Sequence, residues 1–569
     1  MTAIPRAEHP HPQFYRKQWQ NLNGEWEFEI DNSDSGKARG LEKAAHLSGR
    51  ITVPFCPESP LSGIGHTDFM NAVWYRRDFT ISSEQLRGDV LLHFGAVDYA
   101  CEVYINGSPA GQHTGGYTSF TLTITPYLQT GVNSVTVYAR DNTRGALQPT
   151  GKQSPQYASY GCMYTRTTGI WQTVWLEFVP CRRITDFRLT PHPAASSVLV
   201  EAGVNGPGTL RATARYKGRL VGEQTVVTAG ETACMELSLT ETHLWETGHG
   251  RLYDLELVFE EDTVSTYFGL RSASFDGMVW KLNGKPVFQR LVLDQGFYPD
   301  GIYTAPTDEA LRRDIELAMD FGFNGARLHE KVFEPRFLYH CDRAGYLVWG
   351  EFPNWGADHS QPEAVYTILP EWLEAIKRDY NNPSLIGWCP LNETWDQEGR
   401  KQDDRLVRMV YEVTRAVDPT RPCIDTSGNF HVKTDIFCIH DYEQDAAVFR
   451  EHYDRLMTDS TLFDPQGYRQ TYHGEPTFLS EYGGIWWAPE QEEGWGYGDR
   501  PASEQDYLER FKGLTEALLH NNRMFGLCYT QLYDVEQEVN GLCTYDRRPK
   551  FPPEIIRRIL SQTAAAEKE

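Results

Sequence analysis

The stretch LIGWCPLNETW, residues 385–395, begins as an apolar run of strand character and ends on an amide, a carboxylate and an indole. The segment before it, LPEWLEAIKRDY (369–380), has the period of an amphipathic helix. Strand-like runs and helices of this kind alternate from about residue 273 onward. The alternation predicts parallel strands joined by crossover helices, and eight such units form a TIM barrel, the (β/α)8 fold.

Eight apolar runs are the strand candidates of this barrel. They are RLVLDQG (290–296), FNGARLHE (323–330), YLVWGEF (346–352), LIGWCPLNE (385–393), PCIDTSG (422–428), DIFCIHDY (435–442), PTFLSEYGG (476–484) and FGLCYTQLYD (525–534). In the predicted helices, apolar positions share one face, for example Leu311, Ile315 and Ala318, and this stripe is typical of packing against a sheet. We assign residues 273–569 to the barrel.

The sequence pattern before the barrel predicts two β-domains. In residues 1–180, short alternating or aromatic runs are broken by Gly, Pro, Asn and Asp, which predicts a jelly-roll β-sandwich. Asn106-Gly107 is its clearest hairpin turn. Residues 181–272 continue with strands at near-regular spacing and few aromatics, which predicts an immunoglobulin-like β-sandwich. The expected fold is therefore a multidomain one.

Composition excludes several classes of function. With 54 basic and 78 acidic residues the net charge is −24, so the chain lacks the electrostatic footprint of a nucleic-acid-binding protein. Residues 1–20 contain no apolar signal core, and no uncharged apolar stretch is long enough for a membrane span, so we expect a cytoplasmic protein without a membrane partner. The eleven cysteines are scattered singly without a CxxC pair, which predicts reduced and mostly buried thiols.

Polar side chains end the strand candidates, where a TIM barrel carries its chemistry. In strand order they are Asp294 and Gln295, then Arg327, His329 and Glu330, then Glu351, then Asn392 and Glu393, then Asp425, then His440, Asp441 and Tyr442, then Glu481 and Tyr482, and finally Gln531.

Glu393 and Glu481 stand out among these groups, because the fourth and seventh strands can face each other across the barrel mouth. Retaining glycoside hydrolysis requires two carboxyl groups about 5 to 5.5 Å apart, one protonated and one ionised. We expect Glu393 to be the acid, with its pKa raised by Trp388 and Trp395 on either side. Arg327 and the Tyr442 hydroxyl are expected to keep Glu481 ionised.

Four further segments are informative: NGKPVFQR (283–290), the region from GFNGAR to LVWGE (322–351), WCPLNETW (388–395) and FLSEYGG (478–484). Together they resemble glycoside hydrolase family 2, the group of β-galactosidases, β-glucuronidases and β-mannosidases. The resemblance spans essentially the whole chain. It implies that Glu393 is the acid/base, that Glu481 is the nucleophile, and that Asn392 holds the 2-hydroxyl of the sugar.

The chain departs from the family pattern at two places. The glucuronidases carry an Asn-x-Lys motif that grips the substrate carboxylate, whereas this chain reads Val539-Asn540-Gly541-Leu542 there, so a glucuronide is less favoured. The β-galactosidase pattern of a His after the strand-two arginine, and its Glu-x-His magnesium ligands after strand three, is also missing, because Arg327 is followed by LHEK and Glu351 by FPNWG. We therefore expect no metal and no other cofactor.

The remaining candidates would bind or support the sugar. The polar ones are Asp294, Glu330, Glu351, His440, Asp441 and Gln531, and the tryptophans that could stack on a sugar are Trp355, Trp395, Trp486 and Trp487. The resemblance also implies that the N-terminal sandwich borders the barrel mouth, with Asp98 and Tyr164 as candidates.

The interpretation is a retaining exo-glycosidase that acts on a neutral terminal sugar. A β-galactoside-type pyranoside and a furanoside, such as an α-L-arabinofuranoside or a β-D-galactofuranoside, would use the same two carboxylates. The alternatives are a β-glucuronidase, an inverting hydrolase with carboxyl groups about 6.5 to 9.5 Å apart, and a carbohydrate-binding protein without catalysis. Assembly into a homo-oligomer stays open.

Overall fold

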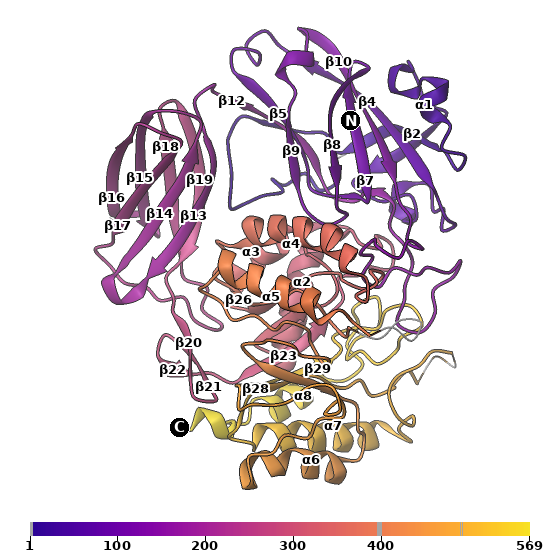
Figure 1. Cartoon of the computed structure of the whole chain (residues 1–569), viewed down its shortest axis with the longest axis vertical. Coiled ribbons are helices and arrows are strands. Elements are labelled where there is room, and N and C mark those ends of the chain that lie inside the picture. Colours follow the sequence, from indigo (N-terminus) through magenta and orange to yellow (C-terminus); the bar gives the residue numbers. More distant parts are fainter. Residues whose placement is uncertain (1–3, 395–400, 490, 492, 569) are drawn as a thin grey trace.

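The computed structural model describes residues 4–394, 401–489, 491 and 493–568. The chain forms three bodies, with two β-domains side by side above an α/β domain (Figure 1). None of the helices in these residues is long and apolar enough to cross a bilayer. All eleven cysteines are free and most are buried, as predicted.

The N-terminal domain is a sandwich of two antiparallel sheets. One sheet has the order β1 (Trp19–Asn21), β12 (Val174–Val179), β5 (Asp89–Phe94), β9 (Phe120–Thr123). The other has the order β3 (Gly49–Val53), β2 (Gly24–Ile30), β4 (Ala72–Ile81), β10 (Gly131–Arg140), β7 (Ala100–Ile105), β8 (Ser108–Thr114). A short pair, β6 (Val97–Asp98) and β11 (Gly169–Ile170), joins them at one end, and α1 (Gly36–Arg39) lies outside.

The predicted hairpin turn at Asn106-Gly107 is confirmed. The turn connects β7 to β8, and Ile105 pairs with Ser108 across it. Both turn residues have positive φ, 52° for Asn106 and 76° for Gly107, as expected for a two-residue turn of the Asn-Gly type.

The second β-domain packs a three-stranded sheet on a four-stranded one, as in an immunoglobulin-like sandwich. The first has the order β13 (Ile184–His192), β14 (Ser197–Val204), β17 (Thr232–Ser238), and the second β16 (Arg219–Thr228), β15 (Gly208–Tyr216), β18 (Leu252–Phe259), β19 (Asp262–Gly269). A small sheet of β20 (Ala273–Asp276), β21 (Val279–Leu282) and β22 (Lys285–Pro286) leads from it into the α/β domain.

The α/β domain is built on a curled sheet of parallel strands. The order is β26 (Leu385–Cys389), β25 (Leu347–Glu351), β24 (Gly325–Leu328), β23 (Gln289–Asp294), β29 (Met524–Thr530), β28 (Thr477–Gly483), β27 (Phe437–Asp441). The helices between them are α2 (Asp308–Phe321), α3 (Pro335–Ala344), α4 (Val365–Asp379), α5 (Asp404–Val417), α6 (Ala446–Thr458), α7 (Glu504–Leu519) and α8 (Pro553–Leu560). Sequential strands are neighbours, as in a TIM barrel.

The fifth strand candidate, residues 422–428, does not form a regular strand. It makes only isolated parallel bridges to the fourth-strand region, Trp388 with Cys423 and Asn392 with Ser427. The chain then reaches β27 without an intervening helix. A physical reason is that Asp425 accepts hydrogen bonds from the backbone N–H groups of Val432 and Lys433, which turns the chain back on itself at once.

Candidate active site

Arg327, at the end of β24, occupies the centre of the barrel mouth. Its side chain is 1% exposed. The guanidinium donates to Glu351 (Nε to Oε1, 2.6 Å), to Glu481 (Nη1 to Oε1, 3.0 Å) and to the Asn392 side-chain oxygen (3.0 Å). Arg327 therefore fixes the ends of three strands relative to one another, and it brings positive charge to Glu481.

Glu481 points into the mouth because β28 is irregular at this point. Phe478 belongs to the core inside the barrel, whereas Leu479 and Tyr482 belong to the core under the helices. The register of β28 against β29 shifts between Leu479 and Tyr482, so two consecutive residues, Ser480 and Glu481, can face inward. Such bulges redirect side chains next to active sites.

The environment of Glu481 keeps its carboxylate ionised. Burial by itself raises the pKa of this carboxyl group, but the positive charges of His440 and Arg327 and a hydrogen bond from the Tyr442 hydroxyl outweigh burial and lower the pKa to about 2. The contacts that the sequence predicted for Arg327 and Tyr442 with Glu481 are present. A buried, ionised carboxylate of this kind is suited to act as a nucleophile.

Glu393 lies opposite Glu481 and is more open to solvent. Its side chain is 28% exposed, compared with 5% for Glu481. Its backbone has φ 42°, a left-handed conformation that non-glycine residues rarely adopt, and its N–H donates to the Ser427 carbonyl (2.9 Å). The segment that failed to form the fifth strand thus holds the turn that aims Glu393.

The expectation that Trp388 flanks Glu393 is wrong. The Trp388 indole points into the layer under the helices, donates to Asp418 (2.8 Å) and packs edge-on against Trp372. Residues alternate faces along a strand, and Trp388 lies on the outward face of β26. Trp395, the other predicted neighbour, lies outside the described residues.

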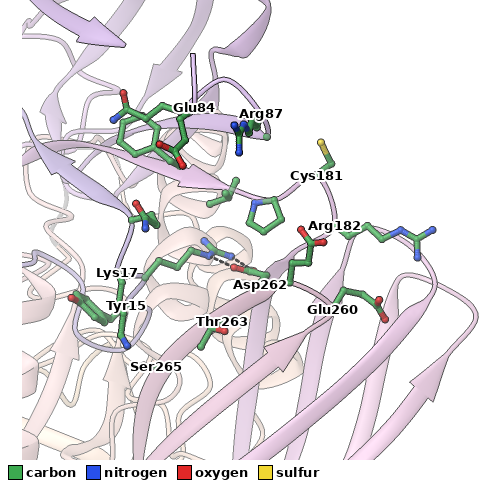
Figure 2. A pocket seen from close by; sticks show the side chains of 18 of the residues that line it. Tyr15, Lys17, Glu84, Arg87, Cys181, Arg182, Glu260, Asp262, Thr263 and Ser265 are labelled. Carbon is green, nitrogen blue, oxygen red and sulfur yellow. Dashed lines mark hydrogen bonds and ion pairs between the residues drawn. The ribbon is translucent and has the colours of Figure 1, made fainter. Parts of the chain in front are cut away.

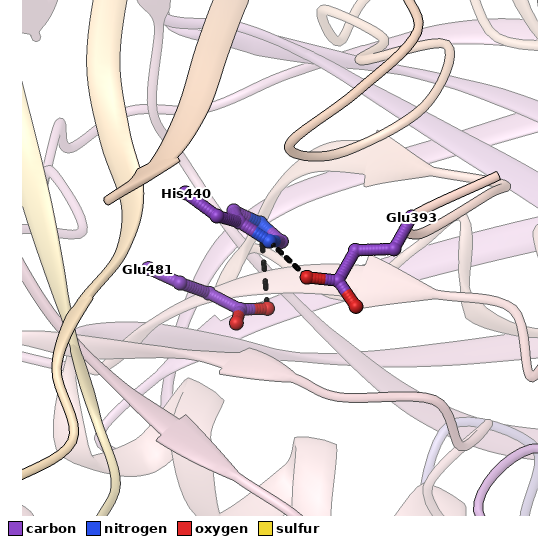
Figure 3. A group of neighbouring side chains, drawn as sticks. All are labelled: Glu393, His440 and Glu481. Carbon is purple, nitrogen blue, oxygen red and sulfur yellow. Dashed lines mark hydrogen bonds and ion pairs between the residues drawn. The ribbon is translucent and has the colours of Figure 1, made fainter. Parts of the chain in front are cut away.

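His440 bridges the two carboxylates (Figure 3). Its Nδ1 lies 2.6 Å from Glu393 Oε1, and its Nε2 lies 3.4 Å from Glu481 Oε1. Burial lowers the pKa of this histidine, but the charges of both glutamates raise the pKa above its ordinary value overall. The ligand-type atoms of the three side chains lie within 4.8 Å of one another, so the two carboxyl groups are close together. An oxygen–oxygen approach this close favours the retaining geometry, with carboxyl groups about 5 to 5.5 Å apart, over the inverting one.

The same three side chains could be mistaken for a metal site, because a histidine and two carboxylates are common ligands. These contacts explain the arrangement without an ion, since a protonated His440 donates from Nδ1 to Glu393, bonds Ser427 Oγ at 3.0 Å through Nε2, and carries positive charge 3.4 Å from Glu481. The absence of a metal cofactor stays a prediction.

Asn392 is oriented for a ligand. Its side-chain oxygen accepts from Arg327, and its backbone N–H donates to Asn354 Oδ1 (2.7 Å). Its Nδ2 is buried and has no hydrogen-bond partner among the described residues. A buried donor without a partner costs free energy, so this amide is suited to donate to a sugar hydroxyl.

Other predicted residues support these groups. Glu351 accepts from Arg327 and lies 3.2 Å from His329 Nδ1, so it orients the arginine. Trp355 donates its indole N–H to the Asn392 carbonyl (3.1 Å), and its backbone N–H donates to Glu330 (3.1 Å).

Glu330 and Gln531 each keep one buried oxygen without a partner in the described part of the chain. Burial raises the pKa of the Glu330 carboxyl group well above its ordinary value. The Gln531 side-chain amide donates to Asn540 Oδ1 (2.8 Å). The Gln531 oxygen therefore remains available as an acceptor, and the free Glu330 oxygen can donate when the carboxyl group is protonated.

Three predicted candidates, Asp294, Asp441 and Trp487, turn away from the catalytic pair. Asp294 accepts from the Tyr533 hydroxyl, and Asp441 accepts from Tyr453 and lies beside His452, so both turn outward toward the helices. Trp487 packs in the core against α7, close to Tyr507. Trp486 is half-buried beneath the Arg500 guanidinium, 5.8 Å away. For the two aspartates the reason is strand alternation: Leu293 and Cys438 face the inside of the barrel, so Asp294 and Asp441 face outward.

The N-terminal domain reaches the mouth through the loop between β10 and β11, residues 141–168. Tyr164 on this loop donates its hydroxyl to Glu538, in the segment after β29. Asp98 lies further back and accepts from Gln153 Nε2 (2.7 Å), so it braces the loop from behind. Of the two predicted residues, only Tyr164 therefore lines the wall of the mouth.

Sequence reasoning missed Lys152, Tyr497 and Glu538. Lys152 is 5% exposed and feels the charges of Glu538, Glu481 and Glu393. Tyr497 stacks on Tyr442 with ring centres 3.4 Å apart. Lys152 and Tyr497 lie on loops far from the strand-end motifs, whereas Glu538 directly precedes the Val539-Asn540-Gly541-Leu542 segment, whose position next to a known specificity motif was a usable signal.

A separate cavity of about 1190 Å³ lies between the two β-domains (Figure 2). Charges of both signs line it, among them Lys17, Glu84, Arg87 and Glu260. Within its lining, the Arg16 guanidinium donates two hydrogen bonds, of 2.9 and 2.8 Å, to the Asp262 carboxylate. The cavity lies away from the strand ends, whereas the close group of a histidine and two carboxylates found among the described residues lies at the barrel mouth, so the mouth is the candidate active site.

Comparison with known families agrees with this geometry. Models of glycoside hydrolase family 2 match three parts of the chain: the sugar binding domain matches residues 63–175, the central family 2 domain matches 182–271, and the TIM barrel domain matches 304–563. The chain belongs to glycoside hydrolase family 2.

Individual relatives are distant. A beta-galactosidase from Thermoanaerobacter pseudethanolicus is 26% identical over 405 residues, which cover 66% of this chain and 51% of that protein. Human beta-glucuronidase is 24% identical over 488 residues, covering 75% of this chain and 72% of that protein. The chain spans about half the length of the first curated relatives it matches.

A solved structure of a Ruminococcus gnavus b-glucuronidase in complex with D-glucuronic acid superposes with a TM-score of 0.80 at 19% identity. The alignment covers 98% of this chain and 100% of that one. At this identity the likeness establishes the fold, including the order of the three domains.

Proposed function

We propose that the protein is a retaining exo-glycoside hydrolase that removes a neutral terminal sugar. The single observation that carries this proposal is the placement of Glu393 and Glu481, whose oxygens approach within 4.8 Å on opposite walls of the mouth. In the first step, Glu481 attacks the anomeric carbon while Glu393 protonates the departing oxygen. In the second step, Glu393 takes a proton from water, and the water releases the sugar from Glu481.

The different environments of the two glutamates support this division of roles. Glu481 has a lowered pKa, is almost fully buried and receives hydrogen bonds from Arg327 and Tyr442, so its negative charge is stabilised before substrate binds. Glu393 is more exposed, which leaves room for the leaving group and then for water. His440 contacts both and can keep positive charge between them.

The loop of residues 141–168 supports exo action, because it contacts the barrel at Pro353, Trp355 and Glu538, and a second domain beside the catalytic strands hinders a polysaccharide chain from crossing the mouth. A neutral glycone is favoured because no lysine stands in the Val539-Asn540-Gly541-Leu542 segment. A β-glucuronidase is the second candidate, because human beta-glucuronidase is among the relatives.

A panel of aryl glycosides tests the proposal. It should include galacto-, gluco-, manno-, fuco- and glucurono-pyranosides together with arabino- and galacto-furanosides. We expect release of the aryl group from one neutral glycoside by the wild-type protein, none by Glu481→Gln, and wild-type rates from Glu451→Gln, whose side chain is 75% exposed. If Glu481→Gln is as active as the wild type, or if the protein binds sugars without cleaving any member of the panel, the proposal is wrong.

A further inference from the structure

Lys152 is held at the barrel mouth by backbone contacts between domains. The N–H groups of Thr150 and Gly151 donate to the Trp355 carbonyl at 2.7 and 3.1 Å. Gly151 has φ 56°, and a Cβ there would lie 2.5 Å from the Glu330 carbonyl oxygen, so a side chain at this position would push the loop away. The close approach places the next residue, Lys152, beside the catalytic strands.

Lys152 is only 5% exposed, and its ammonium group, which keeps some access to solvent, makes no direct hydrogen bond in the residues that the structure describes. Its Nζ lies 5.3 Å from the ring centre of Trp355 and 5.7 Å from that of Tyr164. Burial lowers the pKa of this amine, but the charges of Glu538, Cys162, Glu481 and Glu393 raise the pKa above its ordinary value overall. The group therefore stays positively charged, with three N–H donors to satisfy.

Glu538 provides an acceptor on the adjoining wall. It is 2% exposed, and its two oxygens accept from the Tyr164 hydroxyl and from Asn540 Nδ2 (3.1 Å). A carboxylate offers about four acceptor sites, so capacity remains. Tyr497, stacked on Tyr442, feels the charges of Glu538, Glu393 and Glu481, which locates Glu538 at the same mouth.

We propose that Lys152 and Glu538 hold one hydroxyl group of the terminal sugar between them, with the ammonium donating to the hydroxyl oxygen and the carboxylate accepting from the hydroxyl hydrogen. The two charges attract each other without forming a direct ion pair in the described residues, and a hydroxyl group is both acceptor and donor. This inference rests on the proposed glycosidase function and names the residues that select its substrate.

The arrangement selects a neutral sugar over a uronic acid. The ammonium already lies among the charges of Glu538, Glu481 and Glu393. A substrate carboxylate at this position would add a further negative charge at short range in a buried site, where like charges repel strongly. A hydroxyl satisfies the same donors and acceptor without that cost.

A double-mutant cycle tests the assignment by combining substitutions in the protein with removal of single hydroxyl groups from the substrate. We would measure kcat/KM of wild type, Lys152→Met and Glu538→Gln on the best neutral aryl glycoside and on its set of monodeoxy analogues. Loss of a hydrogen bond to a charged group lowers kcat/KM by about 10- to 150-fold. We expect a loss of this size from each variant on the parent sugar, and no further loss when one particular hydroxyl is absent from the substrate.

Lys43→Met is the matched control, because this lysine lies in the same domain with its side chain 73% exposed. Additive losses at every sugar position would overturn the proposal, because a merely structural role for Lys152 produces that result. A Lys152→Met variant that loses activity on a uronide but not on the neutral glycoside would also overturn it, and would identify Lys152 as a carboxylate-binding residue.

Binding of the free sugar to the inactive Glu481→Gln protein, measured by titration calorimetry, separates this proposal from the proposed function. If Lys152→Met in that background weakens binding about 10- to 150-fold, the hydroxyl contact holds even if no glycoside is cleaved. If binding is unchanged, the hydroxyl contact is refuted even when hydrolysis is observed.

Discussion

Replacing Tyr442 by phenylalanine removes the hydroxyl group that donates to the nucleophile Glu481 and leaves the aromatic ring in place. The ring is held by Tyr497, which stacks on it with an interplanar angle of 5°. The hydroxyl donates to Glu481 Oε2, whereas Arg327 and His440 lie against the other oxygen, Oε1. Tyr442→Phe therefore leaves one carboxylate oxygen without its donor, while the charges around the other are unchanged.

The size of the effect follows mainly from the lost contact with Glu481, because the other hydrogen bond of the hydroxyl, to Thr530 Oγ1, is longer (3.3 Å) and joins two neutral groups. A hydrogen bond to a charged group contributes about 1.5–3 kcal/mol, and each 1.36 kcal/mol corresponds to about a tenfold change in rate. We expect kcat/KM on an aryl glycoside to fall roughly 10- to 150-fold. The pKa of Glu481 should rise, because one of the interactions that lowers it is gone, so the acidic limb of the pH profile should move to higher pH.

Steady-state kinetics from pH 9 down to about pH 2, near the pKa of Glu481, measure both effects, with circular dichroism as a check of folding. A folded Tyr442→Phe variant with kcat/KM within twofold of wild type and an unmoved acidic limb would refute the role given to this hydroxyl. A fall in kcat/KM without movement of the limb would refute the argument that the hydroxyl lowers the pKa of Glu481.

Three further substitutions test other parts of the account. Glu393→Gln should lower kcat/KM by about 10²- to 10⁴-fold on substrates with poor leaving groups and by less on activated aryl glycosides. Added azide should restore turnover of the activated aryl glycosides. A uniform loss on all substrates without rescue by azide would contradict the acid/base role of Glu393. Arg327→Met leaves buried Glu351 and Glu481 without their counter-charge and should lower the free energy of unfolding in urea by about 3–5 kcal/mol, and an unchanged value would contradict this. Burial raises the pKa of Glu371 from 4.5 to about 8. The folded state keeps this proton to higher pH than the unfolded state does, so stability should fall as pH rises from about 4.5 to about 8. Glu371→Gln keeps an acceptor for the Tyr117 N–H but cannot titrate, so its melting temperature should fall less over this pH range than that of wild type. The same fall in melting temperature for both proteins would contradict the prediction.

The strand-end groups of the site were predictable because hydrophobic runs locate strands and a barrel gathers their carboxyl ends. Arg327, Asn392, Glu393, His440 and Glu481 all follow from that logic, and the structure brings them together. The side of the sheet that a strand-end residue faces was harder to predict from the sequence. Alternation along the strand could have turned Asp294 and Asp441 outward, but a bulge such as the one at Ser480 changes the alternation and has no sequence signature of its own.

The irregular segment 422–428 shows a second limit of sequence patterns. PCIDTSG has a strand-like core, yet Asp425 binds the chain that follows it, and the segment contributes Ser427 to the turn of Glu393 instead of forming a regular strand. Lys152 shows a third limit. Its importance comes from a contact between domains, which depends on Gly151 approaching Glu330 across about 180 positions of sequence.

The anomeric configuration of the first sugar released tests the central claim most directly. Proton NMR during the first minutes of hydrolysis of the best aryl glycoside distinguishes the two anomers before they interconvert. The separation of Glu393 and Glu481 predicts that the sugar first appears with the configuration it had in the substrate. First release of the opposite anomer would contradict a covalent intermediate on Glu481 and would require the two carboxyl groups to move apart to admit water.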